Sequence, residues 1–140
     1  MATILVVDDN RDNRRVISRL LEFGGHAAVT ARDGHEALES ARSAQPDLVL
    51  MDLAMPEMDG WATTAAMKQA DDLRAIPVIV VTGHVTRDDI LRAQEVGCQD
   101  VVSKPVDYYV LMDKVARHLG SASNDDTEAT PRLDDTRRSA

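Results

Sequence analysis

Short runs of aliphatic residues alternate with longer amphipathic segments along most of the chain. Runs of this kind, rich in valine, isoleucine and leucine, are typical of strands buried on both faces of a parallel sheet. The strong runs are residues 4–7, 48–51 and 78–81, with a shorter one at 101–102 and a weaker one at 27–30. The pattern therefore predicts five strands.

The intervals between the runs carry helical periodicity, with apolar residues spaced three and four apart. Gly24 and Gly25 end the first helix, Asp59-Gly60 opens the third, and Thr86 is placed to cap the fourth. The apolar positions are Val16, Ile17, Leu20 and Leu21, then Ala37, Leu38, Ala41 and Ala44, then Ile90, Ala93 and Val96, and finally Leu111, Val115 and Leu119. Strict alternation of strand and helix predicts an α/β fold: a doubly wound five-stranded parallel sheet, order 2-1-3-4-5, of the flavodoxin-like type.

The composition sets the domain boundaries. The length of 140 residues fits one domain, which we place at residues 1–120. Residues 121–140 differ, with five acids, three arginines and a single large apolar residue, Leu133. This composition predicts a flexible polar C-terminal tail.

Charge and hydropathy exclude two classes of function. A formal net charge of −8 argues against direct nucleic-acid binding, which needs a basic surface. No apolar stretch approaches the roughly 18 residues of a membrane span, and the first residues lead directly into a strand. We expect a cytoplasmic protein that does not associate with membranes.

Chemically active side chains follow four of the five predicted strands. In a parallel sheet the carboxyl ends of the strands meet at one edge, where ligands bind. The residues in question are Asp8 and Asp9, Asp52, Thr82, and Lys104. Taken singly, the acidic pair, Thr82 and Lys104 are common loop or turn residues, whereas Asp52 is the strongest single signal because it directly follows four apolar residues. Their coincidence in one sheet predicts an acidic metal site that contains a nucleophile.

These residue types suit an aspartyl phosphate at Asp52. A carboxylate and a phosphoryl group repel each other, and a divalent cation overcomes that repulsion. Asp8 and Asp9 offer the hard oxygen ligands that Mg²⁺ prefers. Once Asp52 is phosphorylated, the Lys104 ammonium and the Thr82 hydroxyl could bind phosphoryl oxygens that the metal leaves free.

The chain resembles the receiver domains of two-component response regulators over residues 3 to about 119. The family pattern is an acidic pair after strand 1, an aspartate ending strand 3, Met-Pro, Asp-Gly, a hydroxyl residue ending strand 4, and Lys-Pro after strand 5. It stands here as Asp8-Asp9, Asp52, Met55-Pro56, Asp59-Gly60, Thr82 and Lys104-Pro105. Finding all of these in order makes a chance match very improbable.

The resemblance implies that Asp52 accepts a phosphoryl group from a sensor histidine kinase or a histidine phosphotransfer protein. It implies Mg²⁺, with Mn²⁺ as a substitute, held by Asp9, Asp52 and the main-chain carbonyl of Ala54, with Asp8 helping through water. It assigns phosphoryl-binding and switch roles to Thr82, Gly83 and Lys104, and makes Pro105 a cis-proline candidate.

For the protein as a whole, the resemblance implies a stand-alone phosphoacceptor that is no enzyme in the turnover sense. It would signal by phosphorylation-dependent partner binding, and it could form a homodimer through the face of helix 4, strand 5 and helix 5.

Several positions depart from the family pattern. Receivers usually carry Tyr or Phe three residues before the lysine, and this chain has Val101, which has no ring to move inward on phosphorylation. Tyr108 and Tyr109 are the nearest candidates for a substitute. Ala54 and His84 occupy two positions that tune the site in the family, and Gly83, where alanine is commoner, should leave the site more open. Trp61, directly after Asp59-Gly60, is expected to pack over the start of its helix.

Three other functions fit parts of the pattern. A flavodoxin-like cofactor binder would need a Ser/Thr- or Gly-rich phosphate loop where this chain has Asp8-Asp9-Asn10. An aspartyl-phosphate hydrolase commonly carries a second aspartate where Ala54 stands. A degenerate receiver that no longer accepts phosphate is disfavoured by the complete set of site residues.

Overall fold

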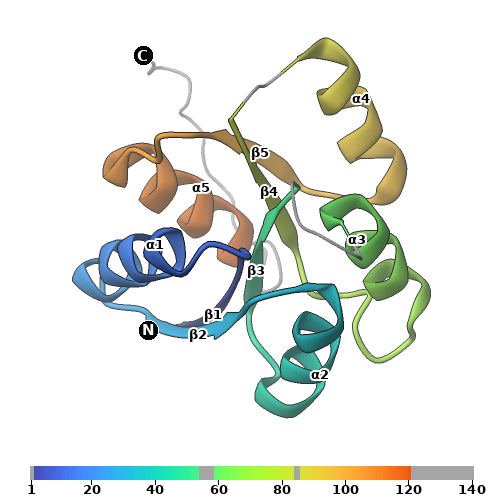
Figure 1. The fold of residues 1–140 in the computed structure, drawn as a ribbon, viewed down its shortest axis with the longest axis horizontal. Helices are drawn as coiled ribbons and strands as arrows, with labels where there is room; N and C mark the ends of the chain where they lie inside the picture. The colour runs from blue at the N-terminus through green and yellow to red at the C-terminus, as the bar shows by residue number, and fades with distance from the viewer. Residues whose placement is uncertain (1, 54–58, 84–85, 121–140) are drawn as a thin grey trace.

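Five parallel strands form a single sheet in the order β2-β1-β3-β4-β5 (Figure 1). The structure is a computed structural model that describes residues 2–53, 59–83 and 86–120. The strands are β1 (Thr3–Val7), β2 (Ala27–Ala31), β3 (Leu48–Asp52), β4 (Val78–Thr82) and β5 (Asp100–Ser103); the helices are α1 (Arg11–Phe23), α2 (Gly34–Ala44), α3 (Gly60–Gln69), α4 (Arg87–Val96) and α5 (Tyr108–Gly120). The predicted fold class and strand order are confirmed.

Helices cover both faces of the sheet. In Figure 1, α1 and α5 lie on one face, and α2, α3 and α4 lie on the other. Because successive strand residues point to opposite faces, each strand contributes to two cores. In β1, Ile4 and Val6 pack with residues of α1 and α5, whereas Leu5 and Val7 pack with residues of α2 and α3. All four are at most 1% exposed, as expected for a strand at the centre of a doubly covered sheet.

The sheet register aligns the ends of the central strands. Val7 of β1 pairs with Met51 of β3, and Asp52 pairs with Val81 of β4. The residues that follow β1 therefore lie beside the last residue of β3. Thr82 pairs with Ser103 of β5, which brings Lys104 to the same edge.

Side-chain caps fix where the helices begin. The carboxylate of Asp59 accepts a hydrogen bond from the backbone N–H of Ala62, and Thr86 Oγ1 accepts one from Asp89. The side chain of Asn10 caps α1 in the same way, by accepting from the N–H of Asn13. Such caps satisfy backbone donors that have no partner in the first helical turn. The expected cap at Thr86 is confirmed.

Two further predictions concern membrane spans and the C-terminal tail. Within the described residues, no helix is long and apolar enough to cross a membrane. The predicted tail, residues 121–140, lies outside the described residues.

Candidate functional site

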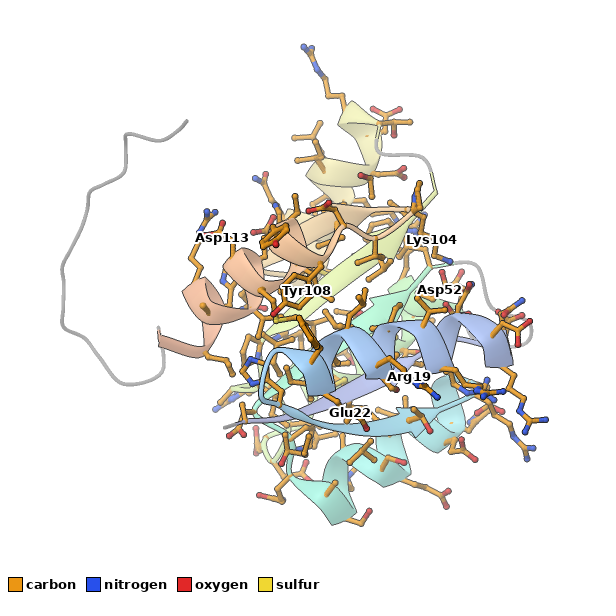
Figure 2. The ribbon with its side chains drawn as sticks, turned by 90° about the vertical axis from the view of Figure 1, so that its left-hand side faces the viewer. Arg19, Glu22, Asp52, Lys104, Tyr108 and Asp113 are labelled. Atoms are coloured by element: carbon orange, nitrogen blue, oxygen red, sulfur yellow. The ribbon has the colours of Figure 1, made fainter. Side chains whose placement is uncertain are left out.

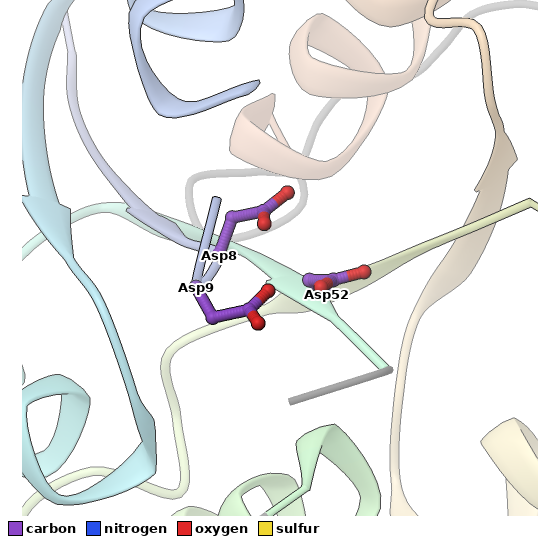
Figure 3. Close-up of side chains that lie close together, drawn as sticks. All are labelled: Asp8, Asp9 and Asp52. Atoms are coloured by element: carbon purple, nitrogen blue, oxygen red, sulfur yellow. The ribbon is translucent and has the colours of Figure 1, made fainter. Parts of the chain in front are cut away.

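Three aspartates gather at the carboxyl edge of the sheet. Asp8 and Asp9 follow β1, and Asp52 ends β3; each offers a carboxylate oxygen, and these oxygens all lie within 4.8 Å of one another. Figure 3 shows the three carboxylates directed toward the same small space. The sequence prediction that these residues converge is confirmed.

Burial differs among the three carboxylates. Asp8 is 2% exposed and Asp52 is 4% exposed, whereas Asp9 is open to solvent. Charges of one sign that are buried together repel each other strongly unless a cation is present. The arrangement is therefore a compact anionic site with one side reachable from water.

Lys104 supplies a cation to this site. Its Nζ lies 3.0 Å from Oδ1 of Asp52 and 3.6 Å from Oδ2 of Asp8. Figure 2 shows Lys104 and Asp52 side by side at the end of the sheet. The backbone N–H of Lys104 donates to the carbonyl of Thr82 at 2.8 Å, and the Lys104-Pro105 peptide bond is cis. The Lys104 ammonium therefore lies directly against the carboxylate of Asp52.

The pKa of the Asp52 carboxyl is raised. Burial is the main cause, and the hydrogen bond from Lys104 opposes it, while the negative charges of Asp8 and Asp9 add to the increase. The pKa of Lys104 is also raised: burial lowers it, but the carboxylates of Asp52 and Asp8 outweigh that effect. The electrostatics of the site therefore favour the binding of a further cation.

The carboxylate oxygens of the cluster are suitable ligands for a hard divalent cation. Oδ1 of Asp8 accepts a hydrogen bond from the N–H of Asn10 at 2.9 Å. Oδ2 of Asp8 is buried and, apart from the Lys104 ammonium 3.6 Å away, has no hydrogen-bonding partner among the described residues. A buried carboxylate oxygen in that state is unfavourable, and carboxylate oxygens are the ligands that Mg²⁺ prefers. Asp8, Asp9 and Asp52 are thus the residues that would hold the ion.

Of the remaining predicted site residues, the structure describes some and not others. Thr82 ends β4 with 9% of its surface exposed, and Gly83 follows it at the surface. A Cβ added to Gly83 would meet no described atom within 4 Å. Ala54 and His84, for which a ligand role and tuning roles were expected, lie outside the described residues.

The suggestion that Tyr108 or Tyr109 replaces the missing aromatic at position 101 stays a prediction, and the structure places the three residues in different surroundings. Val101 packs toward the cluster formed by Trp61, Val80 and Ala93, on the face covered by α3 and α4. Tyr108 instead meets Phe23 of α1 edge to face, with ring centroids 5.4 Å apart, and Tyr109 meets Tyr108 at 5.1 Å. Figure 2 shows Tyr108 beside α1.

Sequence reasoning missed two supports of the site. Arg14 of α1 donates from Nη1 to the carbonyl oxygen of Asp8 at 2.8 Å. Gly60 approaches β3 so closely that a Cβ would collide with the carbonyl oxygen of Asp52 and lie 2.9 Å from Cα of Leu53. The Asp-Gly pair was visible in the sequence as a helix start, but nothing in the pattern indicated this close approach, and no spacing rule points from Arg14 to Asp8.

A parallel sheet whose carboxyl edge carries three clustered aspartates, a hydroxyl residue and a lysine has the arrangement that the resemblance to receiver domains implies. A model of the response regulator receiver domain family matches residues 4–116. The chain belongs to this family.

Curated relatives and solved structures agree with the assignment. The polar-differentiation response regulator DivK of Brucella anthropi is 37% identical over 120 residues, which are 86% of this chain and 98% of the relative. The chemotaxis protein CheY4 of Vibrio cholerae superposes with a TM-score of 0.80 at 29% identity, covering 84% of this chain and 98% of that one. The signal receiver domain of a Syntrophus aciditrophicus signal transduction histidine kinase gives 0.79 at 34% identity, covering 95% and 100%.

Proposed function

We propose that this protein accepts a phosphoryl group on Asp52 in a Mg²⁺-dependent phosphorelay. The observation that carries the proposal is the position of Asp52: a buried carboxylate with its Oδ1 3.0 Å from the Lys104 ammonium and two further aspartates beside it. Membership of the receiver family and the similarity to single-domain regulators such as DivK support the same function.

In the proposed step, a carboxylate oxygen of Asp52 attacks the phosphorus of a phosphohistidine. A P–O bond forms as the P–N bond breaks, and the electron pair of that bond stays on the imidazole nitrogen. Bound Mg²⁺ would neutralise charge on the phosphoryl oxygens. Asp8, Asp9 and Asp52 would hold the ion, as would the carbonyl of Ala54 by family resemblance.

Lys104 and Thr82 would stabilise the aspartyl phosphate once it has formed. Lys104 would pair with a phosphoryl oxygen in place of the carboxylate oxygen that it now contacts. Thr82 and the N–H of Gly83 would take another phosphoryl oxygen, as the family resemblance implies. The acceptor would release its phosphoryl group slowly, so we class the protein as a signalling phosphoacceptor and not as an enzyme.

The partners follow from this chemistry. The donor would be a sensor histidine kinase or a histidine phosphotransfer protein, consistent with the two-component family. We further propose that the protein acts in the cytoplasm, without binding nucleic acid or membrane itself, through phosphorylation-dependent contact with another protein. Pairing of two copies through the α4–β5–α5 face is a second possible output, and a change in molar mass on phosphorylation would reveal it.

The experiment is phosphorylation by acetyl phosphate followed by intact mass. The wild-type chain should gain one phosphoryl group with Mg²⁺ and none with excess chelator, and Asp52→Asn should gain none under either condition. A wild-type chain that gains no phosphoryl mass, or an Asp52→Asn chain that gains as much as wild type, would contradict the proposal. Lys114→Gln, which alters a lysine elsewhere on the domain, serves as the control and should gain one phosphoryl group with Mg²⁺, as the wild type does.

A further inference from the structure

Helix α4 is the helix most lightly attached to the sheet near the site. Within α4, all of which the structure describes, Ala93 is the one buried residue, whereas Ile90 is 42% exposed and Leu91 is 52% exposed. Helix α3 buries five residues over the same length. A hollow of about 250 Å³ also adjoins α4 and β5, where Ile90, Ala93 and Val101 contribute to its lining. An element with so little buried surface moves at low cost.

One aromatic contact joins α4 to the start of α3. The guanidinium carbon of Arg92 lies 4.9 Å from the ring centroid of Trp61, within the range of a cation–π interaction. Trp61 itself is 8% exposed and packs in a cluster with Val80 and Ala93. The indole ring is therefore held between the sheet and α4.

Trp61 is coupled at its other side to the phosphoacceptor strand. The N–H of Gly60, the preceding residue, donates to the carbonyl of Leu53 at 3.2 Å, and Leu53 directly follows Asp52. Leu53 also packs against the Trp61 cluster, as does Val101 from β5. Because Gly60 approaches the Asp52 carbonyl so closely, the first turn of α3 packs tightly against the end of β3.

We propose that Trp61, through its contact with Arg92, transmits the state of the aspartate cluster to helix α4. A ligand that draws in the carboxylate of Asp52 shifts the end of β3, and the tight junction at Gly60 passes the shift to the indole ring. The contact of the indole ring with Arg92 then transmits this shift to α4, a helix that buries few of its residues. Trp61 is in this sense a positioning residue, and it acts where Val101 has no ring to move. The inference rests on the proposed function of Asp52.

Substitutions at Arg92 test the coupling without disturbing the core, because this side chain lies at the surface. Amide hydrogen exchange of α4 is measured with and without Mg²⁺ and beryllofluoride, a phosphoryl mimic. In the wild type we expect the exchange rates of α4 to change on addition. In Arg92→Leu the change should shrink by roughly two- to fivefold, the equivalent of one exposed cation–π contact.

Two matched variants separate the coupling from general effects on α4. Arg92→Lys keeps a cation over the ring and should retain most of the response. Arg87→Leu removes the other arginine of the same helix and should respond as wild type. The fluorescence of Trp61, which is the single tryptophan of the chain, gives a second readout. It should respond to Mg²⁺ and beryllofluoride in the wild type and less in Arg92→Leu.

The outcomes distinguish this inference from the proposed function. Phosphorylation of Asp52 by acetyl phosphate, followed by intact mass, should be the same in all four chains. If it is, and Arg92→Leu keeps the full change in α4 exchange or the wild type has none, the coupling is refuted and the phosphoacceptor role stands. If the wild-type chain takes up no phosphoryl group, the proposed function fails and the coupling fails with it.

Discussion

The ammonium of Lys104 lies 3.0 Å from Oδ1 of Asp52 and 3.6 Å from Oδ2 of Asp8, so one side chain serves two buried carboxylates. Lys104 is 29% exposed, while the two carboxylates are almost fully covered. The lysine therefore neutralises part of the charge that a bound metal ion would otherwise have to balance.

Removing this ammonium should make folding more dependent on metal. In Lys104→Met, two buried carboxylates lose their shared cation, which should cost about 1–3 kcal/mol of folding free energy in the absence of metal. Mg²⁺ should restore part of the loss, because binding to the folded state stabilises it. Thermal unfolding with and without Mg²⁺ measures this: the increase in Tm on adding Mg²⁺ should be larger in Lys104→Met than in wild type. Equal increases would show that the lysine and the metal do not share the same charges.

The raised pKa of Asp52 predicts a dependence of stability on pH. A carboxyl that holds its proton more tightly in the folded chain than in the unfolded one makes folding less favourable as pH rises from its ordinary value of 3.8 through the raised pKa. Asp52→Asn removes this titration, so the variant should melt a few degrees higher than wild type at neutral pH without metal. The difference in Tm should disappear as pH falls to the ordinary aspartate range. A difference that is the same at every pH would contradict the assigned shift.

The close approach of Gly60 to β3 predicts an asymmetry between two glycines. Gly60→Ala should cost about 1–3 kcal/mol, because the new Cβ would meet the backbone of Asp52 and Leu53. Gly83→Ala should change stability by less than about 0.5 kcal/mol, because a Cβ there meets nothing within 4 Å in the described part of the chain. Chemical denaturation compares the two variants. A Gly60→Ala chain as stable as wild type would show that the α3 start is not held tightly against β3.

A polar cluster at the opposite end of β5 should contribute stability that is lost in acid. Asp100 accepts hydrogen bonds from Lys114 at 2.7 Å and from the N–H of Val101 at 2.8 Å, and its Oδ2 lies 3.0 Å from Nε2 of His118. Burial raises the pKa of Asp100, but these partners outweigh it and the net shift is downward. The stability should therefore be present above the ordinary aspartate pKa and disappear as pH falls through the lowered one.

Asp100→Asn tests this cluster, with Asp113→Asn as its matched control. Asp113 pairs with Arg117 on the same helix as Lys114, but both partners are largely exposed, so the pair should contribute less than about 1 kcal/mol. At neutral pH, Asp100→Asn should lower the Tm clearly and Asp113→Asn hardly at all. Equal effects of the two substitutions would argue against a special role for the cluster.

Regular periodicity made the fold predictable from the sequence. The aliphatic runs marked the strands because both faces of a doubly wound sheet are buried, and the acids and the lysine fell at strand ends that the topology brings together. The edge strand β2 was the weakest signal, in keeping with the partial burial of residues such as Val29 and the exposure of Thr30.

Contacts between side chains could not be read from the sequence in the same way. The cation–π pair of Trp61 and Arg92 joins two helices, and the edge-to-face pair of Phe23 and Tyr108 joins two others. Spacing along one helix does not determine which residue of another helix it meets. Whether Tyr108 or Tyr109 takes the part of an aromatic on β5 stays a prediction for the same reason.

The central claim is that Asp52 carries the phosphoryl group, and locating the modified residue tests it most directly. The wild-type chain is treated with acetyl phosphate and Mg²⁺, reduced with borohydride to convert an aspartyl phosphate to homoserine, digested, and sequenced by mass spectrometry. We predict homoserine at position 52, with aspartate unchanged at positions 8 and 9. Homoserine at another aspartate, or none in the presence of Mg²⁺, would contradict the account.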